Sequence, residues 1–313
     1  MWQSPSEDLT RTGVKYFARH KGELNSCVFS PDCQILLTCS DDCRIFLWNA
    51  ATGQLLAKVT GHTGPVKSCV FSPDCTLFAS SSHDRTVRVW HTATTQCLRV
   101  LTGHSKSVET VCFSPDAKWL LSGGWDKTAI LWDVQTGEIA RIFSGHQGAI
   151  QTSMFSLNSQ YVATGSWDYT VKVWSLRAQE REKTLEGHRG NVSCVCFSVS
   201  GMLASGSWDR TVRVWHPRLG TLLFLLEGHT GWVKNLAFSR DGIVLASSGD
   251  HDRVRLWDMS NGRCIKSLKV HAGLAHGCSF APSGALLTTG PADFLLKAGN
   301  ASEEQEADQA QQP

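Results

Sequence analysis

Short segments in which apolar and polar residues alternate recur along most of the chain. One set reads VKSCVF, LFASSS, TVRVW and CLRVL, at residues 66–71, 77–82, 86–90 and 97–101. A period of two residues is typical of strands with one buried face, whereas a helix repeats its apolar positions every 3.6 residues or so. Turn sequences such as SPDC and SSHD separate the segments. The pattern predicts repeated groups of four short strands.

These groups form seven units of 41 or 42 residues, each marked by a histidine near its start. The seven histidines are His20, His62, His104, His146, His188, His229 and His271. Tryptophan closes six of the seven units, at Trp48, Trp90, Trp132, Trp174, Trp215 and Trp257. Four short strands cannot bury their apolar faces alone, so the units must pack against one another. We therefore predict an all-β fold, a seven-bladed β-propeller of four-stranded antiparallel blades with repeats that start near residues 20, 62, 104, 146, 188, 229 and 271.

The motifs within each unit resemble those of the WD-repeat (WD40) family. GH opens a unit, FSPD follows the first strand, and W or WD closes the third, as in GHSKSVETVCFSPDAKWLLSGGWDKTAILWD at 103–133. The resemblance covers about residues 11–299. It implies that an N-terminal strand closes the last blade, and TGVKYFARH at 12–20 does match TGQLLAKVTGH at 52–62. A strand at 14–19 is then expected to join three strands from 274–298, which removes free sheet edges.

The last two repeats depart from the pattern. Repeat six has His251 where an aspartate is expected, with Asp250 and Asp252 on either side. Repeat seven has Gly299 where the other repeats have tryptophan. Loss of an indole removes packing and a hydrogen-bond donor, so we expect the closing blade to be the weakest.

Each unit also contains histidine, serine or threonine, and aspartate, the residue types of a hydrolytic triad. A catalytic site is needed once, whereas this set recurs, so we predict buried structural tetrads and no catalytic residues. The tetrad known in the WD-repeat family implies the same assignment. Repeat one contributes His20, Thr38, Asp42 and Trp48. The next four sets are His62, Ser80, Asp84 and Trp90; His104, Ser122, Asp126 and Trp132; His146, Thr164, Asp168 and Trp174; and His188, Ser205, Asp209 and Trp215.

Three further tryptophans, in GGWD at 123–126 and GSWD at 165–168 and 206–209, each precede a tetrad aspartate in the turn between the second and third strands. Other repeats have Asp41, His83 or Asp250 there, so the fold does not require tryptophan. Exposed indoles are typical of interaction sites, and their faces attract cations. The alternative is that the rings cover the joints between blades. The family resemblance implies that these turns and the starts of the first strands line the top face of the propeller. The predicted partner-binding residues on this face are Trp125, Trp167, Trp208, Trp232, Glu109, Gln151, Asn191 and Lys234.

The resulting hypothesis is a non-enzymatic scaffold that binds protein or peptide partners through arginine, lysine or aromatic anchors. One alternative is a substrate receptor of a ubiquitin ligase, for which WSLR at 174–177 and WHPR at 215–218 are imperfect versions of a family WDxR signature. Another is a chromatin or methyltransferase-complex scaffold that binds Arg- or Lys-containing peptides. Single-stranded nucleic acid is disfavoured because Lys234 is the one cation along the tryptophans.

Composition narrows the class of protein further. A net charge of +2 and 42% apolar residues describe a globular chain without the basic excess of a nucleic-acid binder. The segment MWQSPSEDLTRTG is polar and lacks an apolar h-region, and no apolar run approaches the length of a membrane span. We therefore expect an intracellular protein, cytoplasmic or nuclear or both, with no membrane partner. Without secretion the twelve cysteines indicate reduced core residues, and their spacing predicts no metal or cofactor.

Three parts are expected along the chain. Residues 1–10 are a flexible N-terminus, 11–299 the propeller, and 300–313 an acidic disordered tail that has nothing apolar larger than alanine. We expect one propeller per chain, monomeric within a larger complex.

Overall fold

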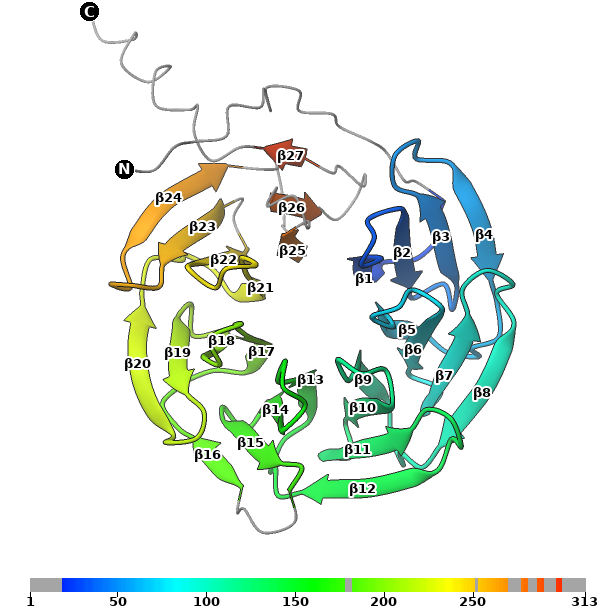
Figure 1. The fold of residues 1–313 in the computed structure, drawn as a ribbon, viewed down its shortest axis with the longest axis horizontal. Coiled ribbons are helices and arrows are strands. Elements are labelled where there is room, and N and C mark those ends of the chain that lie inside the picture. Colours follow the sequence, from blue (N-terminus) through cyan, green and yellow to red (C-terminus); the bar gives the residue numbers. More distant parts are fainter. Residues whose placement is uncertain are drawn as a thin grey trace, which may run out of the picture.

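The computed structural model describes residues 19–177, 182–250, 253–269, 277–280, 286–289 and 297–299. Six sheets of four antiparallel strands stand around a central axis (Figure 1). Within every sheet the strands are hydrogen-bonded in sequence order, from the axis outwards. Each sheet is therefore one blade, and blades 1 to 6 are β1–β4, β5–β8, β9–β12, β13–β16, β17–β20 and β21–β24.

The strands of the six blades have equivalent bounds. The innermost strands are β1 (Leu24–Phe29), β5 (Val66–Phe71), β9 (Val108–Phe113), β13 (Ile150–Phe155), β17 (Val192–Phe197) and β21 (Val233–Phe238). The second strands are β2 (Ile35–Ser40), β6 (Leu77–Ser82), β10 (Trp119–Gly124), β14 (Tyr161–Ser166), β18 (Leu203–Ser207) and β22 (Val244–Gly249). The third strands are β3 (Ile45–Asn49), β7 (Thr86–His91), β11 (Thr128–Asp133), β15 (Val171–Ser175), β19 (Val212–His216) and β23 (Arg253–Asp258). The outermost strands are β4 (Leu55–Val59), β8 (Cys97–Thr102), β12 (Ile139–Ser144), β16 (Lys183–Leu185), β20 (Thr221–Leu226) and β24 (Cys264–Lys269).

The prediction of seven four-stranded blades was wrong, because the structure has six. The seventh repeat gives a three-stranded sheet of β25 (Gly277–Phe280), β26 (Leu286–Thr289) and β27 (Lys297–Gly299). In the other repeats a buried tryptophan stands near the end of the third strand, whereas the sequence has Gly299 at that place here. The strand expected at 14–19 lies outside the described residues, as do the proposed termini 1–10 and 300–313.

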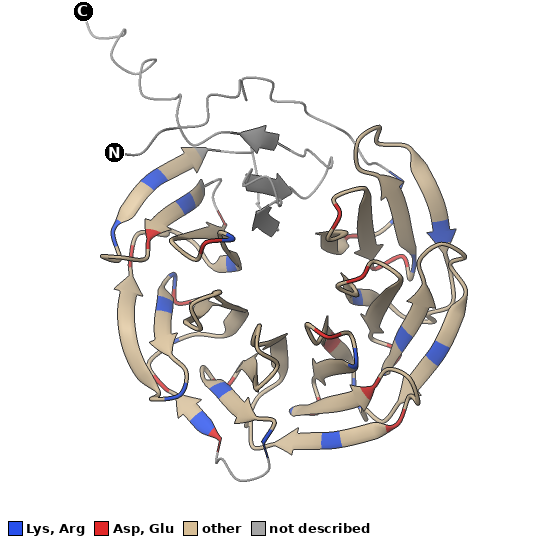
Figure 2. Cartoon of the chain, viewed as in Figure 1, with Lys and Arg blue, Asp and Glu red and all other residues tan. Residues whose placement is uncertain are grey.

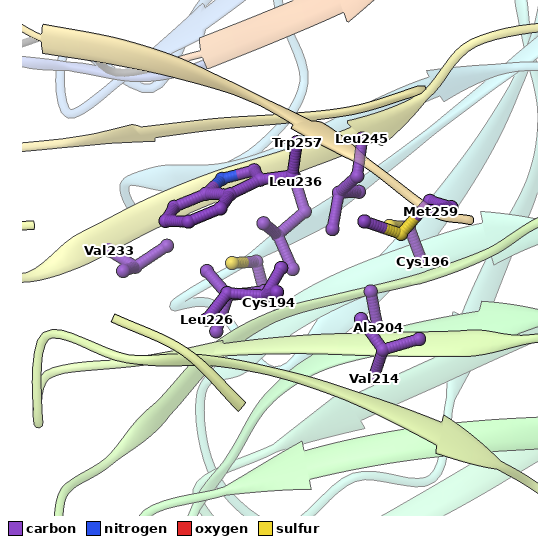
Figure 3. Packing of buried hydrophobic residues seen from close by; sticks show 11 residues of the cluster. Cys194, Cys196, Ala204, Val214, Leu226, Val233, Leu236, Leu245, Trp257 and Met259 are labelled. Atoms are coloured by element: carbon purple, nitrogen blue, oxygen red, sulfur yellow. The ribbon is translucent and has the colours of Figure 1, made fainter. Parts of the chain in front are cut away.

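The apolar cores lie between blades as well as within them. Between blades 5 and 6, Val214 and Leu226 of one blade pack with Val233, Leu245 and Trp257 of the next (Figure 3). Equivalent clusters join the neighbouring pairs of blades around the ring from blade 1 to blade 6. Because each blade buries one of its faces against its neighbour, the position of one blade fixes the position of the next.

Glycine near the end of the second strand allows blades 3 to 6 to approach closely. A Cβ on Gly123, Gly165 or Gly206 would come within 2.6 Å of the first β-branched side chain of the following blade. Blades 1, 2 and 6 have Cys39, Ser81 and Ser248 at this place. The three glycines lie two residues before Trp125, Trp167 and Trp208, so close packing of the blades brings these turns together.

Candidate interaction face

A hydrogen-bonded relay ties the strands of each blade to one another. In blade 3 the Trp132 Nε1–H donates to Ser122 Oγ at 2.8 Å, and Ser122 Oγ lies 2.7 Å from His104 Nε2. His104 Nδ1 lies 2.8 Å from Asp126 Oδ2. An ionised carboxylate can only accept, so His104 donates from Nδ1 and accepts the serine proton at Nε2. The relay is therefore satisfied with a neutral imidazole.

The same relay forms in blades 1, 2, 4 and 5. The histidine Nδ1 to aspartate distances are 3.0 Å in His20–Asp42, 2.7 Å in His62–Asp84, 2.7 Å in His146–Asp168 and 2.8 Å in His188–Asp209. The tryptophan Nε1 to hydroxyl distances are 2.9 Å in Trp48–Thr38, 2.9 Å in Trp90–Ser80, 2.9 Å in Trp174–Thr164 and 2.8 Å in Trp215–Ser205. All five hydroxyl residues are 0% exposed, so none can reach a substrate as a nucleophile.

In blade 6 the described residues show the tryptophan, serine and histidine of the relay. Trp257 Nε1 donates to Ser247 Oγ at 2.8 Å, and Ser247 Oγ lies 2.6 Å from His229 Nε2. Burial and the charge of Arg255 lower the pKa of His229 to about 4. Residues 251 and 252, where the sequence offers a histidine and a flanking carboxylate, lie outside the described residues. The lowered pKa keeps the His229 imidazole neutral at physiological pH.

The tetrad aspartate also fixes the turn that follows the second strand. Asp126 Oδ2 accepts the Ser105 backbone N–H at 2.9 Å, and Oδ1 accepts the Thr128 backbone N–H at 3.1 Å. Burial alone would raise the pKa of Asp126, but the hydrogen bond and charge of His104 and the hydroxyl of Thr128 lower it to about 2. The carboxylate is therefore stabilised in its charged form.

We predict that Asp126→Asn removes a pH-dependent part of the folding free energy. Because the folded pKa is lowered from 3.8 to about 2, the stabilisation is complete above pH 4 and is lost as the pH falls through 2. Guanidinium unfolding of both proteins should differ by about 2 kcal/mol at pH 7, and the difference should shrink towards pH 2. A difference that stays constant between pH 7 and pH 2 would show that the charge of Asp126 is not what stabilises the turn.

Trp125, Trp167, Trp208 and Trp232 form one continuous row across blades 3 to 6, which we call the tryptophan row. The ring centroids of Trp125 and Trp167 are 4.9 Å apart, and those of Trp167 and Trp208 are 5.6 Å apart, with tilted planes. Trp208 and Trp232 are stacked at 4.2 Å with 5° between their planes. The end members Trp125 and Trp232 are 41% and 43% exposed, and the two between them are half-buried. The rings therefore cover the joints between blades and also present indole surface to solvent.

The backbone holds these turns against the first strand of their own blade. The Trp125 N–H donates to Ser107 O, and the Trp167 N–H donates to Ala149 O, both at 2.9 Å. The Trp208 N–H donates to Asn191 O at the same distance. Side chains from the turn and from the start of the first strand consequently emerge on one face, as the register of the repeats predicts.

The polar residues assigned to this face have different roles within the structure. Gln151 Oε1 accepts the Trp167 Nε1–H at 2.9 Å, which fixes the tilt of that ring. Lys234 Nζ lies 4.9 Å from the centroid of Trp232 and 5.5 Å from that of Trp208. Asn191 supports Trp208 through its backbone carbonyl only. The Lys234 ammonium therefore already occupies the aromatic faces at the blade 6 end of the row.

Glu109 lies at the other end of the row. Its Oε1 accepts the Ser107 hydroxyl at 2.7 Å, and Ser107 O is the acceptor that holds Trp125. Acidic residues, drawn red, also stand on loops near the axis in blades 1, 2 and 3 (Figure 2). Glu109 thus places a carboxylate at the blade 3 end of the row and Lys234 an ammonium at the blade 6 end, where the Asp250 backbone N–H also donates to Trp232 O at 3.0 Å.

Blades 1 and 2 carry a polar network that was not predicted from the sequence. Asn25 Nδ2 donates to Asp41 Oδ1 at 2.7 Å and also contacts Val66 O at 2.8 Å. Lys67 Nζ donates to Asp41 Oδ1 at 2.9 Å across the joint between the blades. Although burial opposes it, the bonds from Asn25 and Lys67 lower the pKa of Asp41. Asp41 occupies in blade 1 the turn position that Trp125 occupies in blade 3. Asn25 and Lys67 occupy the same position in the first strands of blades 1 and 2. Alignment of the repeats could therefore have predicted this polar network.

Comparison with known families agrees with this geometry. A family model described as "IFT122 first beta-propeller" matches residues 23–218, more than half of the chain, and one described as "WD domain, G-beta repeat" matches residues 220–258. The chain belongs to the WD-repeat family. WD-repeat propellers generally act as scaffolds for protein interactions.

Curated relatives match this WD-repeat chain over a short stretch. WD repeat-containing protein 38 of Homo sapiens is 52% identical over 48 residues, which are 15% of this chain and 15% of the relative. Its Mus musculus counterpart is 51% identical over 48 residues, or 15% of this chain and 16% of the relative. The matched stretch thus spans about a sixth of the length of each relative.

Two negative observations apply to the part of this WD-repeat chain that the structure describes. No group of three or more histidine, cysteine, aspartate or glutamate side chains there is placed to hold a metal ion. Likewise, no helix in that part has the length and hydropathy that crossing a membrane requires.

Proposed function

We propose that this WD-repeat propeller is a non-enzymatic scaffold that binds extended peptide segments of partner proteins along the tryptophan row. The observation that carries the proposal is the contact of four indoles from four blades, with 41% and 43% exposure at the two ends. The turn position is occupied by Asp41 and His83 in blades 1 and 2, so the fold does not account for the tryptophans. Contiguous exposed aromatic surface of this kind favours a protein partner.

The charges near the row favour one orientation of the bound peptide. Lys234 already lies over Trp208 and Trp232, so a cationic side chain of a ligand is disfavoured at the blade 6 end. At the blade 3 end Trp125 is exposed and Glu109 lies close by. We therefore place an arginine or lysine of the partner over Trp125, and aromatic or acidic groups towards Trp232.

The ubiquitin-ligase alternative has less support. In WSLR the residue between tryptophan and leucine is Ser175, which is 4% exposed and accepts the Arg177 backbone N–H at 3.1 Å. The WDxR signature has an aspartate at that place, which carries a negative charge, whereas Ser175 is uncharged. Binding of Arg- or Lys-containing tails, the other alternative, is a special case of the peptide binding proposed above.

The proposal is tested by affinity purification of partners from cells with the wild-type chain and with Trp125→Ser. Leu219→Ser is the matched control, because Leu219 is 68% exposed and lies in the turn between β19 and β20, away from the row. We expect partners to be reduced by Trp125→Ser and retained by the control. Equal recovery of partners with all three proteins would refute a binding role for the tryptophan row. The affinity of the chain for a histone-tail peptide, compared with its affinity for a ubiquitin-ligase adaptor, separates the two wider alternatives.

A further inference from the structure

An apolar hollow of ≈ 560 Å³ lies between blades 2 and 3. Leu77, Val89 and Leu98 of blade 2 form one side, and Trp119 and Val134 of blade 3 form the other. Leu98 is 43% exposed, so apolar surface there is open to solvent. The hollow offers room for a side chain of a binding partner.

The hollow and the tryptophan row lie at opposite ends of the strands. Trp119 begins β10 and lines the hollow, whereas Trp125 follows the end of the same strand. At roughly 3.3 Å per residue, six strand residues separate the two ends by about 20 Å. A partner in the hollow therefore leaves the tryptophan row free.

Two cations stand at the rim of the hollow without a carboxylate partner among the described residues. The Arg99 guanidinium donates to Leu98 O at 3.1 Å and to Gln135 O at 3.0 Å, and Lys118 is exposed. Arginine has five N–H groups, so three donors of Arg99 stay available for a ligand. The ion pairs of lysine and arginine in the described chain involve Lys67 and Lys172 instead.

The carboxylates close to the rim are held by neighbouring groups. Asp133 Oδ1 accepts the Thr136 backbone N–H at 2.8 Å. Asp116 Oδ1 accepts the Ser114 hydroxyl at 2.6 Å and the backbone N–H of Lys118 at 3.2 Å. Neither carboxylate lies within ion-pair distance of Arg99 or of the Lys118 ammonium, but Asp133 itself lines the hollow. Although burial opposes it, the Ser114 hydroxyl and the backbone N–H and charge of Lys118 lower the pKa of Asp116. The free N–H donors of Arg99 are therefore the main contact for an external anion, and Lys118 adds positive charge at the rim.

The neighbouring joint provides an internal comparison. Between blades 1 and 2 a hollow of ≈ 380 Å³ is lined by equivalent residues, among them Ile35, Leu47 and Leu56. Ala57 stands there in the place of Arg99, and Thr76 in the place of Lys118. The apolar hollow is thus present at both joints, whereas the pair of cations distinguishes the joint between blades 2 and 3 from that between blades 1 and 2.

From this combination we propose that the hollow between blades 2 and 3 docks a short segment of a second protein, in which an apolar side chain is flanked by acidic residues. The apolar side chain enters between Leu98 and Trp119. A flanking carboxylate accepts two N–H bonds from Arg99, and a second faces Lys118. Charge complementarity at the rim selects an acidic segment over a neutral or basic one.

The test uses the full chain and a fluorescein-labelled peptide, Gly-Ser-Asp-Glu-Leu-Glu-Asp-Ser-Gly. The double variant Arg99→Ala with Lys118→Thr gives this joint the residues found between blades 1 and 2. We expect fluorescence polarisation to show binding that weakens at least tenfold in the double variant, at equal melting temperature. Peptides with serine for leucine, or with lysine for the acidic residues, should bind at least tenfold more weakly than the original.

The position of the peptide is checked with 5-fluorotryptophan labelling. The 19F signal of Trp119, assigned from Trp119→Phe, should shift on addition of the peptide, and that of Trp125 should not. Any one of three results would overturn the proposal. These are equal peptide binding by the double variant, a Trp119 signal that does not shift, and concentration-dependent self-association of the chain in place of peptide binding. Retention of peptide binding in the Trp125→Ser chain shows that the hollow acts independently of the tryptophan row.

Discussion

Replacement of Trp125, Trp167 and Trp208 together by serine is expected to abolish partner binding at the tryptophan row while the propeller stays folded. Indoles at the centre of an interface commonly account for most of the binding energy, so we expect affinity to fall at least a hundredfold. The fold loses ring contacts of about 0.5 to 1.5 kcal/mol for each pair and the bond from Trp167 to Gln151. None of the three belongs to a buried core cluster.

This triple variant is measured by partner pull-down and by thermal unfolding in parallel. In a chain of this size a loss of a few kcal/mol lowers the melting temperature by about 10 °C at most. Lost partners with a melting temperature inside that range support the binding role. A larger fall, with a broad or multistep transition, would mean that the row chiefly holds blades 3 to 6 together, and the binding proposal would be withdrawn.

Ser122→Ala is expected to cost more stability than deletion of a hydroxyl that makes a single bond, because one oxygen satisfies two buried groups. Ser122 Oγ accepts from Trp132 Nε1 and bonds His104 Nε2, and the residue is 0% exposed. The substitution leaves Trp132 Nε1 and His104 Nε2 without the bond that each makes to the Ser122 hydroxyl. At about 1 to 3 kcal/mol for each unsatisfied buried group, the free energy of unfolding should fall by about 2 to 4 kcal/mol.

Ser122→Thr is the matched control for this effect. Thr38 and Thr164 make the same two bonds in blades 1 and 4, so threonine is compatible with the relay. We expect it to stay within about 1 kcal/mol of wild type in guanidinium unfolding. If alanine and threonine proved equally destabilising, the size of the side chain and not the hydroxyl would be the decisive property of this position.

The repeat pattern was sufficient to predict the blades and their register, because each blade depends mainly on residues close to it in the sequence. The histidine spacing and the alternating segments placed strands such as β5 and β6 at their observed bounds. The number of four-stranded blades was wrong because a repeat count says nothing about closure. The seventh repeat has Gly299 where the others have tryptophan, and the fourth strand expected at 14–19 lies outside the described residues.

The repeat positions of the four tryptophans could be read from the sequence, whereas the contacts between their rings could not; a binding role for them stays a prediction. Register placed Trp208, Trp232 and Lys234 on one face, but the stacking of the two rings beneath the Lys234 ammonium depends on how closely blades 5 and 6 approach. That approach is set by Gly206 against Val233, where the backbone of one repeat meets a side chain of the next. Sequence periodicity describes each blade by itself and contains no distance between blades.

In blades 1 to 5 the hydrogen-bonded relay is constant, whereas the turn residue beside it varies, so these five turns are interchangeable. The residue before the tetrad aspartate is aspartate, histidine or tryptophan in blades 1 to 5, while the hydrogen bonds behind it stay the same. Turn segments could therefore be transplanted from one blade to another without rebuilding the core. New partner preferences, in evolution or in the laboratory, would then require changes at surface positions alone.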